Sequence, residues 1–177
     1  MQKSIWVFGI IAGILCAVLE YLFFGGEGGN ANVMFLAKIA VLVICTAAGL
    51  ILIRKLMGGV ISIARTVMSG VLISLVRALV MVIAFGFLYY PSGAFYQAKI
   101  QESWNQAENK VASDDKIKPA DKSMELAVIR EQIAALYQPT GYAMITIGGS
   151  LVSGLIVAIL MAAFIGTNTM YNEPKKH

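Results

Sequence analysis

Residues 66–90, TVMSGVLISLVRALVMVIAFGFLYY, decide the fold. The run holds about 25 residues, and an apolar run of at least about 18 residues is long enough to cross a bilayer as a helix. Its single charge, Arg77, falls near the middle. A charge at that depth is costly and usually faces other protein. We therefore expect a membrane helix whose Arg77 is accommodated by neighbouring helices.

Three further apolar runs, at residues 4–24, 33–53 and 142–165, flank this stretch. The 177-residue chain is 58% hydrophobic and only 14% charged, whereas an average soluble domain is about 25% charged. The composition therefore predicts an all-α integral membrane protein. We expect a four-helix bundle in the lipid bilayer, with residues 1–177 forming a single membrane domain.

The first run could also be a secretory signal, whose apolar region is about 7–15 residues long and precedes a small-residue cleavage site. This run is longer and lacks an A-x-A site, so we expect a retained span. Small residues in the first and fourth spans let helix backbones approach closely, although glycines also occur in spans by chance. The residues expected to line such contacts are Gly9, Gly13, Gly148, Gly149, Ser153 and Gly154.

Residues 92–138 are polar and lie between the third and fourth spans. Ile100, Trp104 and Val111 recur at helical spacing there, which predicts an amphipathic helix. A second helix is expected to begin near Asp121 and to end before Pro139. The segment is therefore predicted to be a helical hairpin outside the bilayer.

The basic residues near the span ends lie on one side of the membrane if the chain crosses it four times. Cytoplasmic loops carry an excess of Lys and Arg, so both termini are expected in the cytoplasm and the hairpin outside. The residues that support this topology are Lys3, Arg54, Lys55, Arg65, Lys175 and Lys176.

Residue patterns typical of catalysis, cofactor binding and metal binding are missing from the sequence. It has no G-x-S-x-G turn, Walker loop or dinucleotide fingerprint. Cys16 and Cys45 lie inside apolar runs and His177 is terminal, which gives no metal-site spacing. Asp114 and Asp115 fit a solvated turn. We therefore expect no catalytic residue, cofactor, metal or nucleic-acid partner.

Glu20, Lys38 and Arg77 are ionisable residues within the predicted spans, where charged side chains are costly and usually have a function or a partner. At about 1.5 Å per helical residue, Glu20 and Arg77 lie about 24 Å and about 18 Å into the membrane, within reach of one another. Lys38 either extends to the interface or lies level with Glu20. The group is therefore a structural ion pair or a polar site for an ion, proton or anionic headgroup. Arg77 could instead contact another subunit or a lipid phosphate.

Several short motifs, in their order and spacing, resemble the domain-of-unknown-function family DUF4199. They are residues 8–13 (FGIIAG), 59–62 (GVIS), 70–75 (GVLISL), 89–91 (YYP) and 153–156 (SGLI), with the mixed-charge helical segment before the last. An aromatic residue often follows the serine of the second motif, and here Ile63 stands there. The resemblance implies a small bacterial inner-membrane protein with four spans and no assigned reaction.

Two functions fit these features. The first is a non-enzymatic subunit, assembly factor or scaffold that acts through helix–helix contacts, as a homo-oligomer or with a membrane-protein partner. The alternative is an oligomeric small transporter or channel that uses Glu20, Lys38 and Arg77. A membrane enzyme acting on lipid is a third class, for which no catalytic set is visible.

The predicted topology can be tested by cysteine labelling from outside the cell. A thiol placed at Asp115, in the hairpin, should be modified, and a thiol placed at Gly58, in the basic loop, should not. Labelling of both positions, or of Gly58 alone, would contradict the topology.

Overall fold

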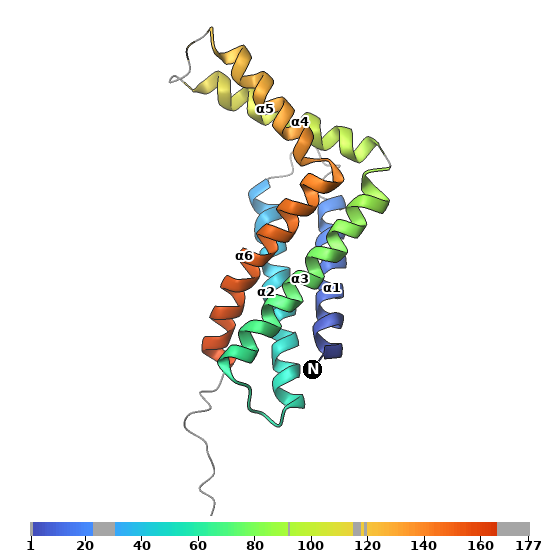
Figure 1. Ribbon diagram of the computed structural model, residues 1–177, viewed down its shortest axis with the longest axis vertical. Helices are drawn as coiled ribbons and strands as arrows, with labels where there is room; N and C mark the ends of the chain where they lie inside the picture. The colour runs from blue at the N-terminus through green and yellow to red at the C-terminus, as the bar shows by residue number, and fades with distance from the viewer. Residues whose placement is uncertain (1, 23–30, 92, 115–117, 119, 166–177) are drawn as a thin grey trace, which may run out of the picture. The chain divides into compact units, whose positions relative to one another are not determined.

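The computed structural model describes residues 2–22, 31–91, 93–114, 118 and 120–165. The regular elements among the described residues are helices, as the sequence predicts (Figure 1). The elements in chain order are α1 (Gln2–Leu22), α2 (Ala31–Leu56), α3 (Ile63–Ala84), the π-helix η1 (Phe85–Tyr89), α4 (Ala94–Ser113), α5 (Lys122–Leu136) and α6 (Pro139–Ile165).

Four helical stretches are long and apolar enough to cross a membrane: Gln2–Leu22, Val33–Leu56, Ile63–Tyr89 and Pro139–Ile165. The all-α membrane fold is thereby confirmed, and the chain is a multi-pass membrane protein.

The helix ends differ from the predicted runs for local reasons. Arg54 and Lys55 belong to the last turn of α2, where a cation interacts favourably with the helix dipole. The helix α6 begins at Pro139 rather than at residue 142, because proline is well suited to the first helical turn. Residues 23–24, the predicted end of the first run, lie outside the described residues.

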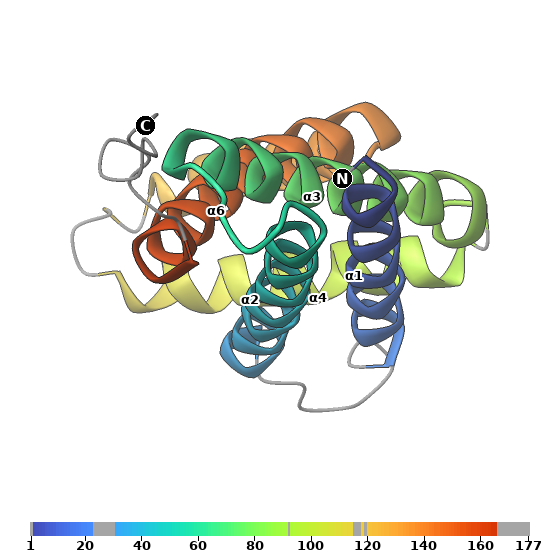
Figure 2. The ribbon, with the colours of Figure 1, turned by 90° about the horizontal axis from the view of Figure 1, so that it is seen from below.

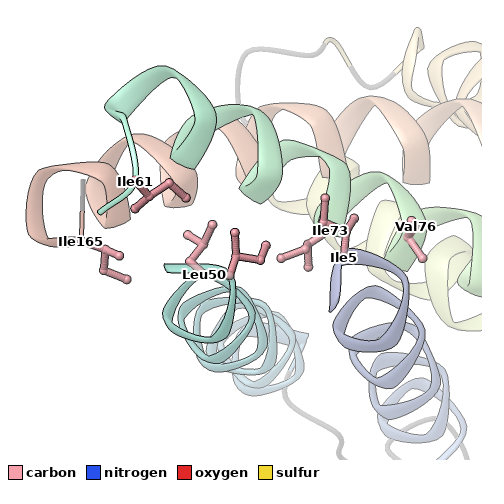
Figure 3. Close-up of a cluster of buried hydrophobic side chains, with 7 residues drawn as sticks. Ile5, Leu50, Ile61, Ile73, Val76 and Ile165 are labelled. Atoms are coloured by element: carbon pink, nitrogen blue, oxygen red, sulfur yellow. The ribbon is translucent and has the colours of Figure 1, made fainter. Parts of the chain in front are cut away.

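The chain divides into two compact units. The first contains α1, α2, α3 as far as Met81, and α6 from Thr146 onward, and the second spans Val82–Ile145. In the first unit, α2 lies between α1 and the last turns of α6 (Figure 2). A buried apolar cluster joins its four helices and the segment before α3 (Figure 3). Its members are Ile5, Leu50, Ile53, Ile61, Ile73, Val76 and Ile165.

Two glycines of α1 allow its backbone to lie directly against α3. A Cβ added at Gly9 would lie 2.5 Å from the Cβ of Val76, and one added at Gly13 would lie 2.5 Å from the Cβ of Val80. Each added Cβ would also lie 3.0 Å from a backbone carbonyl oxygen of α3. Real Cβ atoms do not approach so closely, so this helix contact requires glycine.

The small residues of α6 divide between an inner and an outer face. Gly154 packs against Ser74 of α3, whereas Gly148 and Gly149 are exposed with nothing within 4 Å of an added Cβ. The hydroxyl of Ser153 donates to the carbonyl oxygen of Gly149 in its own helix, at 2.7 Å. Among the described residues, no neighbour approaches Gly148 or Gly149 as closely as α3 approaches Gly9 and Gly13.

The second unit contains the helical hairpin of α4 and α5. Ile100 and Val111 of α4 are buried, and the Arg130 guanidinium of α5 lies over the Trp104 ring, 5.6 Å from its centroid. Arg130 also forms an ion pair with Glu108. The amphipathic pattern therefore predicts the helix pair correctly.

The second unit also contains a π-helical turn, η1, which continues α3. The Tyr90 N–H donates to the Phe85 carbonyl at 2.8 Å, an i→i+5 bond. The Phe85 ring stacks on that of Tyr142 with centroids 3.8 Å apart. This aromatic contact ties η1 to the first turns of α6.

The glycine contact between α1 and α3 gives a stability prediction. Gly13→Ala should lower the free energy of unfolding by about 1–3 kcal/mol, because overpacking forces the two backbones apart. The matched control, Gly86→Ala, adds its methyl group to open space and should be neutral or slightly stabilising. Thermal unfolding of the two variants in detergent checks this, and equal melting temperatures would contradict the packing.

Candidate functional site

Four polar side chains, one from each membrane helix, lie buried or partly buried in the first unit. We call this group the polar layer: Glu20 of α1, Lys38 of α2, Arg77 of α3 and Ser150 of α6. Glu20, Arg77 and Ser150 are buried, with exposed fractions of 5%, 7% and 2%. Buried ionisable groups in a membrane domain are costly and usually functional or structural, so the layer is the candidate site.

The buried face of α1 carries Glu20 into the layer. Gly9, Gly13, Cys16 and Glu20 follow one another at intervals of three or four residues and are all buried. Such spacing places side chains on one face of a helix. The glycine contact with α3 therefore also turns the Glu20 carboxylate towards the helices.

Glu20 forms an ion pair with Lys38, whose Nζ lies 2.8 Å from Oε2. The side chains are 7% and 20% exposed, respectively. A charge-assisted hydrogen bond is stronger in such a water-poor environment. Lys38 is thus held by a carboxylate of α1, which agrees with the alternative in which it lies level with Glu20.

Arg77 is held by α6 rather than by Glu20. Its Nη2 donates to the Ser150 hydroxyl at 2.8 Å, and the Ser74 hydroxyl donates to the Ser150 backbone carbonyl at the same distance. The Nε of Arg77 is buried and has no hydrogen-bond partner among the described residues. Glu20 and Arg77, which the sequence suggested as a pair, thus have different partners. The Glu20 carboxylate binds Lys38 of α2, and the Arg77 guanidinium binds Ser150 of α6.

Cys16 lies between the Glu20–Lys38 pair and Arg77. It is fully buried, and its Sγ lies 4.0 Å from the Lys38 backbone carbonyl, to which it donates. The thiol is also close enough to interact electrostatically with both Arg77 and Lys38. The Glu20–Lys38 pair and Arg77 thus belong to one neighbourhood.

Sequence reasoning missed Ser150, which lies among small residues and was grouped with none of the charges. The available signal was that Ser74 and Arg77 are three residues apart and share a face of α3. A helix facing them must supply an oxygen acceptor, and α6 offers few hydroxyl groups.

The layer brings groups of opposite charge together inside the first unit. Its ionisable members are two cations, Lys38 and Arg77, and one carboxylate, Glu20. The described residues contain no cluster of His, Cys, Asp and Glu side chains that could hold a metal ion. The arrangement therefore suits helix registration or ion binding.

A double-mutant cycle tests the Glu20–Lys38 pair. Lys38→Met should lower the free energy of unfolding by about 3 kcal/mol, because it leaves a buried carboxylate without its cation. Adding Glu20→Gln to Lys38→Met should recover much of that loss. Chemical unfolding of both single variants and the double variant gives the coupling. Additive effects would show that the two residues do not interact.

Comparison with known proteins identifies a family. The family described as a protein of unknown function, DUF4199, matches residues 7–167, which is most of the chain. No curated protein and no solved structure shows a significant match. The match extends from the first membrane helix to just beyond α6, and the chain therefore belongs to the DUF4199 family.

Proposed function

We propose that this chain is a non-enzymatic subunit, assembly factor or scaffold of the bacterial inner membrane. It acts through helix–helix contacts with a second copy or with another membrane protein. The observation that carries the proposal is the uncovered small-residue face of α6. We call this surface the α6 outer face and define it by Gly148, Gly149, Val152 and Ile156.

Helix association in lipid depends on close packing, since lipid tails are as apolar as the helices themselves. Small residues contribute to it only where another backbone approaches. Gly9, Gly13 and Gly154 have such a neighbour inside the chain, but Gly148 and Gly149 have none among the residues that the structure describes. The α6 outer face is therefore free to receive a helix from another molecule.

The burial of α6 supports the same proposal. In the most apolar 18-residue stretch of each membrane helix, the buried share is 28% for α6 and 33–39% for the other three. Val152 and Ile156 are 62% and 55% exposed and follow Gly148 at four-residue steps, which places them on one side of the helix. They would flank a partner helix that rests on the glycines.

The proposed orientation has both termini in the cytoplasm and the α4–α5 hairpin outside. It follows from the position of basic residues at the ends of the described helices. Lys3 is near the start of α1, Arg54 and Lys55 are in the last turn of α2, and Arg65 is near the start of α3. All four lie on one side if the helices cross the membrane in turn, and that side is cytoplasmic by the positive-inside rule.

The polar layer favours one alternative, a small oligomeric transporter or channel that uses Glu20, Lys38 and Arg77. Buried charges contributed by several helices are a feature of ion pathways. The two functions differ in what the Glu20→Gln, Lys38→Met double variant does. A scaffold keeps its cellular role once the pair is removed together, whereas a transporter folds but loses ion or proton flux in liposomes.

The helix-contact proposal predicts that Gly149→Leu keeps the folded chain but weakens its assembly. The leucine side chain points into open space in a single chain, so the melting temperature of the dissociated chain should stay close to the wild-type value. The partner helix cannot approach, so the mass of the intact complex extracted in mild detergent should fall.

Ala40→Leu serves as the matched control, because Ala40 is an exposed small residue of a different membrane helix. It should leave the complex intact. An unchanged complex in Gly149→Leu, or a wild-type chain that is already alone after mild extraction, would overturn the proposal.

A further inference from the structure

The polar layer has an unequal number of buried charges. Among the residues of the four membrane helices that the structure describes, Glu20 is the only carboxylate, and it binds Lys38 at 2.8 Å. The positive charge of Arg77 therefore has no ionic partner within these helices. We propose that the Arg77 guanidinium binds a small monovalent anion, of the size of a halide, inside the membrane domain.

An arginine guanidinium stays charged in proteins, so the imbalance needs a negative partner. The Nη2 of Arg77 bonds to the Ser150 hydroxyl, a neutral acceptor. Its Nε is buried without a partner among the described residues. A guanidinium has five N–H donors in one plane, so donor capacity remains for an anion beside the Ser150 contact.

The surroundings of Arg77 select the class of anion. The side chain is 93% buried, being 7% exposed, and its neighbours belong to its own chain, with Ser150 on α6 and Cys16 on α1. A carboxylate on another subunit therefore has no open approach. Arg77 also lies about 21 Å along α3 from Ile63 at about 1.5 Å per residue, which is deeper than lipid phosphates in a core about 30 Å thick. A small mobile anion meets both constraints.

Binding would neutralise the layer and hold α3 against α6. This role does not depend on the proposed function, because an anion that fixes two helices serves a scaffold as well as a transporter.

The test uses the full chain purified in detergent, with chloride replacing gluconate at constant ionic strength. Gluconate is too large to enter a buried site. The wild-type melting temperature should rise with the logarithm of chloride concentration above the dissociation constant. Equilibrium binding of radiolabelled chloride should approach one ion per chain. Arg77→Gln should abolish both effects.

A second variant keeps the proposal testable if Arg77→Gln does not fold. Lys38→Met retains Arg77 but releases the Glu20 carboxylate, so the layer becomes neutral without chloride, and chloride binding should fall at least tenfold. Lys55→Gln removes an exposed cation at the end of α2 and should bind chloride as the wild type does.

The outcomes are distinct. A wild-type chain with no bound chloride and no chloride effect on melting overturns the proposal. Undiminished chloride binding in a folded Arg77→Gln or Lys38→Met variant also overturns it. A loss of binding in Lys55→Gln equal to that in Lys38→Met would assign the effect to surface screening and would likewise overturn it.

Discussion

The ion pair between Glu20 and Lys38 is the constraint on which the polar layer depends. Glu20 is the only carboxylate in the four membrane helices that the structure describes. Once Lys38 takes it at 2.8 Å, Arg77 must find another acceptor, and Ser150 of α6 provides a neutral one. The Glu20–Lys38 pair thus joins α1 to α2, and the hydrogen bond from Arg77 to Ser150 joins α3 to α6. One ion pair and one hydrogen bond thus link the four helices as two pairs.

Close backbone packing makes that choice, because side chains of similar depth meet only if their helices are turned towards one another. Gly9 and Gly13 bring α1 against α3, and the same face of α1 carries Cys16 and Glu20 inward. Gly154 does the same for α6 against Ser74. Apolar contacts then fill the remaining space, so glycine faces set the register and the charges follow it.

The sequence predicted the architecture well because length and hydropathy determine it. Long apolar runs identified the four membrane helices, and helical spacing of Ile100, Trp104 and Val111 predicted the hairpin. It predicted the site less well. Depth along a helix could be calculated for Glu20 and Arg77, but the rotation of each helix could not. For that reason the sequence left open whether Lys38 pairs with Glu20, and it did not identify Ser150 as the partner of Arg77. It also did not distinguish the inner face of α6 from the outer face.

A charge swap tests the central claim most directly, because it keeps the composition of the layer and exchanges the two ends of the pair. The variant Glu20→Lys, Lys38→Glu should fold with a melting temperature well above that of either single change, since the carboxylate and ammonium groups meet again across the same helix contact. If the double swap is no more stable than its worse single variant, Glu20 and Lys38 are not partners. The account in which α1 pairs with α2, and Arg77 of α3 therefore turns to Ser150 of α6, is then wrong.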